Sequence, residues 1–344
     1  MRNRDIPIEM KLGSVMSSVI ARGASALLAL AGIVSCNTVF TDQSDCPRGL
    51  SLRFVYDYHM EYVNSFHKQG HCVNVYVFDE SGNYVDNWVE TGEVIKDENW
   101  RMRKQLEAGT YTLIAYGGLC CDGTSFIPPQ FKSRSPEAAE DSRVVLKCDR
   151  QVSDKSLHPL FYGTTTVELR KDDFVEDTIY FKKNTNNIRF VLQQLNGEQI
   201  KADEFDVRIV DDNSTLDLDN DPVPAGEITY LPWVSGEKVI GTQEDGQTPV
   251  SAAFYELSTS RLTTATSPRL IVTNNATGET IINIPLNTYL LLLKSELYAD
   301  MPAQEFLDRV SEWSLVFFLD SGNRWYNARI IVNDWVVRIN NSEM

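Results

Sequence analysis

Basic residues are scarce in this sequence. The 344 residues include 32 Lys and Arg against 48 Asp and Glu, which gives a formal net charge of -16. Without residues 1–35 the chain keeps 28 basic against 46 acidic residues, or -18. A surface this acidic repels phosphate backbones and anionic headgroups, so it argues against nucleic acid as a partner. The charge favours solubility and identifies no ligand.

Local motifs of catalysis are also absent. The sequence has no G-x-S-x-G, no H-E-x-x-H and no glycine-rich phosphate loop, and no C-x-x-C accompanies its four histidines. Alternating carboxylates at 217–221 lack the central Gly and terminal Glu of a calcium-binding EF-hand loop, which favours a solvated turn. We therefore predict that the protein is not an enzyme and binds neither a metal nor a cofactor.

The apolar stretch at residues 24–34 is too short to span a membrane, which takes roughly 20 residues. It follows the basic residues Lys11 and Arg22, as the core of a signal peptide does. The stretch runs into Ile33-Val-Ser-Cys36, the pattern of a lipobox. Small Ser35 gives a signal peptidase access to the scissile bond, and the Cys36 thiol can take a diacylglyceryl group. We predict a signal peptide over 1–35, cleavage between Ser35 and Cys36, and a lipid anchor on Cys36, with an ordinary signal peptide as the alternative.

Five further cysteines follow Cys36, namely Cys46, Cys72, Cys120, Cys121 and Cys148. An exported protein can form disulfides, and an odd number leaves at least one thiol free. Adjacent Cys120 and Cys121 cannot easily pair with each other, because neighbours in a strand point to opposite faces. We predict a Cys46–Cys72 bridge that ties a polar tether, residues 36–45, to the first sheet.

Strand patterns dominate the chain after residue 46. Alternation of apolar and polar residues at 52–58 has the period of a strand with one buried face. The apolar run at 73–78 is followed by a turn and then by Tyr84-Val85, which predicts a hairpin. Similar short patterns recur to residue 339, with turns rich in Asn, Asp and Gly between them. This spacing predicts an all-β fold of stacked β-sandwiches with few short helices.

A polar break at residues 182–187 contains no apolar side chain, and the strand pattern restarts at Ile188. We place a domain boundary there, with an N-terminal β-sandwich over 46–183 and a C-terminal one over 184–344. One helix is predicted over 302–313, since Pro302 suits a helix start and Phe306, Leu307, Val310 and Trp313 fall on one side.

Three stretches of the chain resemble the FimB-type fimbrial anchor family, the minor lipoprotein subunits of type V pili. The first covers 45–57 and 71–83, the second 212–220 and 228–232, and the third 289–294, 304–309 and 335–340. Together with the lipobox they span nearly the whole chain after Cys36 in the expected order. Ser214 departs from the family, which often has Gly at that place in the acidic loop.

The resemblance implies two tandem transthyretin-like Greek-key sandwiches and a role in anchoring a fimbrium to the outer membrane and limiting its length. The implied partners are a fimbrial shaft pilin or accessory pilin, and the outer membrane through the lipid. A sheet edge can accept or donate a strand to the next subunit. The resemblance also implies that type V pilins polymerise after proteolysis removes an N-terminal strand. Here a cut at Arg48 would separate the body from its lipid, so we place strand exchange at the C-terminus, in the segment that contains Ile330, Val332, Trp335, Val337 and Ile339.

Two alternatives stay open. The C-terminal strands can simply close the second sandwich, since strands of this length are ordinary core elements. A surface glycan-binding lipoprotein would also be β-rich and lipidated, and its signature would be a flat platform of exposed aromatic side chains. The candidates for such a platform are Trp88, Trp100, Trp233 and Trp325.

Overall fold

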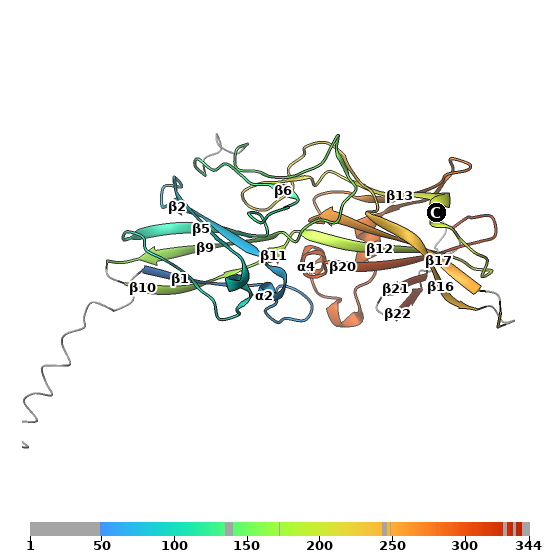
Figure 1. Ribbon diagram of the computed structural model, residues 1–344, viewed down its shortest axis with the longest axis horizontal. Helices are drawn as coiled ribbons and strands as arrows, with labels where there is room; N and C mark the ends of the chain where they lie inside the picture. The colour runs from blue at the N-terminus through green and yellow to red at the C-terminus, as the bar shows by residue number, and fades with distance from the viewer. Residues whose placement is uncertain are drawn as a thin grey trace, which may run out of the picture. The chain divides into compact units, whose positions relative to one another are not determined.

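The computed structural model describes residues 49–134, 140–171, 173–242, 246, 247, 249–325, 329–332 and 335–338, the last two ranges by their backbone only. Figure 1 shows strands throughout this part of the chain, and only short helices join them. The predicted all-β class is therefore confirmed. Ser35, Cys36, Cys46 and Ile339 lie outside the described residues.

Two sheets face each other in the first sandwich. One has the order β10-β1-β4 and the other the order β11-β9-β5-β2-β3. Strand β1 is paired in parallel with β10 and antiparallel with β4. Apolar side chains at alternate positions of β1, including Leu50, Leu52 and Phe54, are buried against the larger sheet, as the alternation in the sequence predicts. These strands are β1 (Gly49–Val55), β2 (Cys72–Asp79), β3 (Tyr84–Thr91), β4 (Met102–Lys104), β5 (Gly109–Gly117), β9 (Phe161–Leu169), β10 (Phe174–Tyr180) and β11 (Lys182–Lys183).

Strand β2 is buried on both faces. Val73, Val75 and Val77 face the core between the two sheets, whereas Tyr76 and Phe78 belong to the core on the other side. The segment between β5 and β9 supplies much of that second cover, with β6 (Phe126–Ile127), β7 (Val144–Leu146) and β8 (Val152–Ser153). Burial on both faces explains why this strand has a nearly continuous apolar sequence.

The second sandwich also consists of two sheets, with the orders β16-β17-β12-β20 and β19-β18-β13-β15-β8. Strand β12 is paired in parallel with β20, as β1 is with β10. A small sheet, β14-β7-β6, and the separate hairpin β21-β22 complete the topology. The strands are β12 (Thr185–Gln194), β13 (Phe205–Asp211), β14 (Thr215–Leu216), β15 (Ile228–Tyr230), β16 (Val234–Thr242), β17 (Pro249–Ser260), β18 (Arg269–Asn274), β19 (Thr280–Pro285), β20 (Glu312–Leu319), β21 (Arg329–Val332) and β22 (Trp335–Arg338).

The predicted boundary at residue 183 falls between β11 and β12, but segments from both sides of it share sheets. Strand β7 is paired with β14, and β8 with β15. The larger hydrophobic core likewise joins side chains from both sides of residue 183, such as Tyr116 and Leu216. The division into domains 46–183 and 184–344 stays a prediction, and below we use "first" and "second" sandwich only for the sheets named above.

The helices differ from the prediction in length and number. Helix α4 (Ala303–Arg309) starts after Pro302 as expected, but Val310 is already extended and Trp313 is buried in β20. The predicted end at residue 313 is therefore wrong. Helix α3 (Leu286–Leu291), which buries Leu286 and Leu290, was not predicted. The remaining short elements are α2 (Phe66–Gln69) and 3₁₀ turns at Glu93–Lys96, Ala202–Glu204 and Glu296–Tyr298.

The predicted Cys46–Cys72 bridge needs correction. Cys72, at the start of β2, is bonded to Cys121, with 5.4 Å between the two Cα atoms. The turn after β5 brings Cys121 to this place, since the amide of Gly118 donates to the carbonyl of Cys72 at 3.0 Å. Cys120 and Cys148 are free thiols. The bridge thus closes a loop within the first sandwich and is not attached to the tether.

Removal of the Cys72–Cys121 bridge tests this pairing. Replacement of both cysteines by Ser should lower the free energy of unfolding by about 2–4 kcal/mol, because the unfolded chain regains the freedom of the loop. Urea titration of the oxidised protein measures the change, and the Cys46→Ser variant is the control that should match wild type. A loss of stability in Cys46→Ser, with Cys46 and Cys72 found in one linked peptide, would contradict the structure.

Candidate functional site

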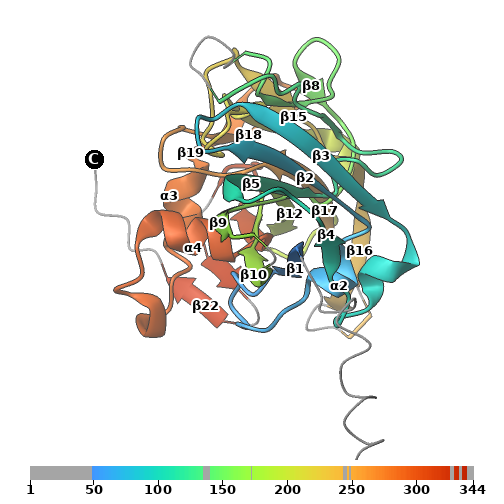
Figure 2. The same ribbon diagram turned by 90° about the vertical axis from the view of Figure 1, so that its left-hand side faces the viewer.

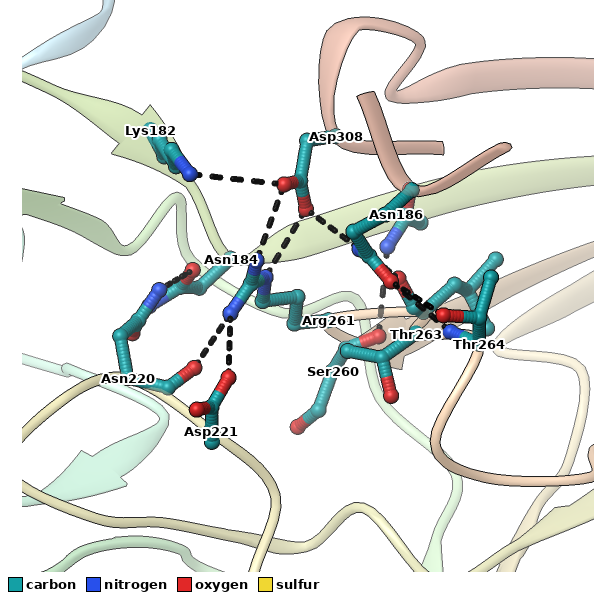
Figure 3. Close-up of polar contacts among 12 residues, drawn as sticks. Lys182, Asn184, Asn186, Asn220, Asp221, Ser260, Arg261, Thr263, Thr264 and Asp308 are labelled. Carbon is teal, nitrogen blue, oxygen red and sulfur yellow. Dashed lines mark hydrogen bonds and ion pairs between the residues drawn. The ribbon is translucent and has the colours of Figure 1, made fainter. Parts of the chain in front are cut away.

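The polar break at residues 182–187 is the best candidate for a functional site, because the structure buries it. Asn184 is 0% exposed, Thr185 3%, Asn186 4% and Lys183 8%. An exposed linker would leave these groups in water, and buried polar groups need partners. The segment therefore acts as part of a junction between the two sandwiches. We call its polar contacts the junction network (Figure 3).

An ion pair lies at the centre of the junction network. The guanidinium of Arg261, just after β17, binds the carboxylate of Asp308 in α4 through two bonds, Nε to Oδ1 and Nη2 to Oδ2, each 2.9 Å. The two side chains are 8% and 2% exposed. Lys182 adds a third charge, with Nζ 3.7 Å from Oδ2 of Asp308 (Figure 3). A bidentate pair of this kind is directional as well as charged, so it fixes α4 against the end of β17.

Arg261 also holds the acidic loop at residues 217–221. Its Nη1 donates to the carbonyl of Asn220 and lies 3.7 Å from the carboxylate of Asp221. The loop is closed by Asp217, whose Oδ1 accepts the amides of Asp219 and Asp221 at 2.9 Å each. The alternating carboxylates thus order a turn. Within the described ranges, no three His, Cys, Asp or Glu side chains come close enough together to hold a metal ion.

Asparagine side chains complete the junction network. The amides of Asn184 and Asn220 bond to each other in both directions, and the second bond, from Nδ2 of Asn220, measures 3.0 Å. Asn186 donates to the carbonyl of Ser260 and accepts from the indole of Trp313, both at 3.2 Å. These amides satisfy backbone and side-chain groups that burial would otherwise leave without partners.

Contacts around the edge of the junction network come from the first sandwich. The ring of Tyr58 lies 4.0 Å from the guanidinium carbon of Arg309, at the end of α4. On β9, the hydroxyl of Tyr162 donates to the carbonyl of Leu218 at 2.9 Å. Burial raises the pKa of Tyr162 to about 12, which extends the pH range over which this hydroxyl can donate further into the alkaline region.

Burial disfavours the charged form of Lys183, which lies in this segment. Its ammonium lies 3.4 Å from the hydroxyl of Ser311 and 3.6 Å from the carboxylate of Glu312. Burial lowers the pKa of Lys183, and the charge of Glu312 opposes that shift. The network therefore combines charges with amides and hydroxyls, and it contains no nucleophile with an adjacent base. It is suited to hold two bodies together.

The described residues predicted for strand exchange lie in a separate C-terminal hairpin. Ile330 and Val332 lie in β21, and Trp335 and Val337 in β22, with Ile331 opposite Val336 in an antiparallel ladder. This hairpin is a sheet of its own and is not part of the ladder order of the four-stranded sheet that ends in β20. Among the helices described, none is long and apolar enough to cross a membrane.

The aromatic side chains considered for a glycan platform do not share one exposed surface. Trp88 is 5% exposed, and Trp100 stacks on Phe54 with ring centres 5.7 Å apart. Trp325 packs against Phe317 with ring centres 5.6 Å apart. Trp233 differs, since it is 41% exposed. A single exposed ring is ordinary on a protein surface.

Arg261 and Asp308 were not found from the sequence, and no local pattern indicates them. They lie 47 residues apart, and each is an ordinary charged residue in its own segment. The polar break at 182–187 was recognised, but its composition is equally typical of an exposed linker.

Comparison with known proteins defines the class of this molecule. A candidate adhesin of Bacteroides thetaiotaomicron is 46% identical, covers 87% of this chain and 100% of its own, and has a TM-score of 0.80. A candidate polysaccharide-binding protein of the same organism is 28% identical over 86% of this chain and 99% of its own, with a TM-score of 0.73. These similarities show that the chain shares its fold with both solved structures over most of its length. No curated protein matched the chain.

The family follows from a match over most of the chain. Residues 43–341 match the family of fimbrillin-A associated anchor proteins Mfa1 and Mfa2, and the chain belongs to this family. The fimbrial anchor protein Mfa2 from Porphyromonas gingivalis has the same fold, with 18% identity over 85% of this chain and 99% of its own and a TM-score of 0.64. The predicted resemblance to fimbrial anchor proteins is confirmed, and membership supports a fimbrial accessory or anchor role at the cell surface.

The Arg261–Asp308 pair can be tested by removing one partner. Arg261→Met should destabilise the protein by about 3–5 kcal/mol, because Asp308 would remain buried without its main counter-ion. The double variant Arg261→Met/Asp308→Leu should recover much of this loss, and denaturant unfolding measures both.

A matched control is available on the neighbouring strands β12 and β17. Arg189 pairs with Glu256 at 2.7 Å, but its side chain is 61% exposed. Arg189→Ala should therefore cost less than about 1 kcal/mol. Equal losses of unfolding free energy in Arg189→Ala and Arg261→Met would show that the buried pair contributes no more to stability than the exposed one.

Proposed function

We propose that this protein is a minor fimbrial subunit that tethers a type V fimbrium to the outer membrane through lipid on Cys36, and limits the length of the fimbrium. The observation that carries this proposal is family membership over residues 43–341, with the lipobox Ile33-Val-Ser-Cys36 a short distance before the matched region. Two or three acyl chains on one cysteine anchor a protein stably.

The position of Cys36, shortly before the first strand, supports a role at the base of the filament. Strand β1 begins at Gly49, so only a short polar segment separates it from Cys36. A lipid at this end holds the first sandwich near the membrane and leaves the second sandwich for contact with pilin. A subunit held in this way accepts pilin on one side only, which would end the filament at its base.

Deletion of the gene and electron microscopy of cells and medium test the anchor role. Without the protein, fimbriae should be overlong or shed into the medium. A strain that carries Cys36→Ser should shed fimbriae as the deletion does, whereas Cys46→Ser should keep them on cells. Attached fimbriae of normal length in the deletion strain would refute the proposal.

We further propose that the C-terminal hairpin exchanges strands with a pilin. The described parts of β21 and β22 pair with each other, and neither has a place in the ladder order β16-β17-β12-β20. A two-stranded hairpin is marginally stable by itself, and β21 packs on β20 without a place in that ladder order, so the hairpin can leave while the four paired strands stay together. Pilin would then pair along a strand of this segment, and apolar Ile330, Val332, Trp335 and Val337 would supply side-chain contacts.

Truncation after Asn327 tests strand exchange. The truncated protein should keep its far-UV circular dichroism but lose binding to purified pilin, and a peptide of residues 329–339 should compete with the full chain. Val89→Lys, on the edge strand β3 of the first sandwich, is the control that should bind normally. If the truncated chain binds pilin as well as the full chain does, another surface makes the contact.

A surface glycan-binding role is the second candidate, because one relative is a candidate polysaccharide-binding protein with 28% identity. Exposed Trp233 is the aromatic side chain that such a role would use first. Unchanged fimbriae in the deletion strain, together with lost growth on or binding to a polysaccharide, would favour this candidate.

A further inference from the structure

Strand β1 and strand β10 form a parallel ladder along their whole lengths, from Gly49 opposite Phe174 to Val55 opposite Tyr180. The ladder is closed at each end by a further bond. The amide of Gly49 donates to the carbonyl of Asp173 at 2.8 Å, and the amide of Phe181 donates to the carbonyl of Val55 at 2.7 Å. Strand β1, the first strand of the sandwich, is thus bonded along its length to β10, the last long strand of the sandwich.

The ladder runs toward the second sandwich. Just after β1, Tyr58 packs on Arg309 of α4, so the end of β1 at Val55 lies at the junction. Gly49 lies at the other end of the strand, about 20 Å away at the usual rise per residue. Strand β10 runs the same way, and the chain continues from it through β11 into β12 (Figure 1). Figure 2, which looks along the first sandwich, shows β10 beside β1.

The second sandwich repeats this arrangement. Strand β12 leaves the junction and is paired in parallel with β20, from Asn187 opposite Glu312 to Gln194 opposite Leu319. The end of β20 therefore lies away from the junction, and the hairpin β21-β22 follows it in the chain. One continuous segment, β10 to β12, is thus bonded in parallel to the first strand of the described chain and to the last strand of the main sheet.

We infer that these two parallel ladders are a pair of load-bearing clamps in series, which resist a pull between the lipid end and the C-terminal end of the chain. The inference rests on the proposed function, since an anchor between a membrane and a filament is pulled at these ends. Such a pull acts along β1 and β10 in shear. All bonds of a ladder loaded in shear must break together, whereas a strand pulled sideways loses its bonds one after another.

Packing strengthens the first clamp. Leu50, Leu52 and Phe54 of β1 are locked in the core, so β1 cannot slide without exposing them. Gly49 lies close to β4, because a Cβ on it would come within 2.5 Å of the carbonyl oxygen of Lys104, and its φ of +99° suits glycine. The strand is therefore held from its first residue.

Single-molecule pulling in two directions tests the clamps without weakening the fold. The full chain carries one handle at its N-terminus and a second on a click-reactive amino acid that replaces either Ser321 or Ser81. Exposed Ser321 follows the far end of β20. Ser81 lies just beyond the end of β2, where Asp79 pairs with Tyr111 of β5, and Tyr111 pairs with β9 near its last residue. The chain then reaches Asp173, which bonds to Gly49, so Ser81 and Gly49 lie at the same end of the first sandwich. A pull through Ser81 therefore peels β1 sideways.

The first sandwich should unfold at several times higher force through Ser321 than through Ser81, because forced unfolding follows the barrier along the direction of pull. Equal forces in the two geometries would overturn the inference. If the forces differ but fimbriae stay attached in the deletion strain, the clamp stands and the proposed function fails. If fimbriae are shed but the forces are equal, the anchor role stands and the clamp fails.

A matched proline pair tests the ladder itself. The end bonds at Asp173 and Phe181 place the amides of odd-numbered residues of β10 toward β1, and the amide of Thr178 instead donates to the side chain of Asp177. Asp177→Pro removes a ladder bond, whereas Glu176→Pro removes an amide that faces away. Through Ser321, only Asp177→Pro should lower the unfolding force. Asp177→Ala measures the part that belongs to the side chain, and an equal fall in Glu176→Pro and Asp177→Pro would refute the ladder.

Discussion

The buried pair of Arg261 and Asp308 is the contact on which the junction depends. Each charge is almost fully covered, so neither is stable there without the other. Their bond fixes the segment after β17 and the last turn of α4, and Arg261 in turn holds the acidic loop beside Asn184. The sandwiches meet through contacts that cannot be exchanged for water without a large cost, which makes the segment between them a rigid connection.

A rigid junction determines how the two parallel ladders are loaded when the chain is pulled at its ends. The path through the main chain by which force that enters β1 reaches β20 runs along β10, residues 181–184 and β12, and the contacts of the junction network lie beside it. A flexible linker would transmit the same force, but it would let each sandwich turn so that its terminal strand is peeled. A buried linker keeps both ladders aligned with the pull. Family membership supports an anchor role, and the topology suits a protein that carries load between two ends.

Local patterns predicted much of the fold and little of the junction. The alternation in β1 was found because one residue in two faces the core between the sheets, and the hairpin of β2 and β3 was found because a continuous apolar run precedes a turn. Helix α4 ends earlier than its apolar spacing suggests, because Val310 is extended and Trp313 packs as part of a strand. Cys72 pairs with Cys121 because of the turn after β5, which cysteine spacing does not reveal. The break at 182–187 has the composition of a linker, and only contacts with distant Asn220, Trp313 and Asp308 bury it.

Calorimetry of the full chain tests most directly whether the junction joins the two sandwiches into one cooperative unit. The account predicts a single thermal transition whose calorimetric enthalpy equals the van't Hoff enthalpy, because loss of either sandwich would expose the junction network. In Arg261→Met the scan should still show one transition, at a lower temperature, since paired strands and the larger hydrophobic core also join the two sandwiches. Two well-separated transitions in the wild-type protein would contradict the account, because they would mean that each sandwich is stable without the other.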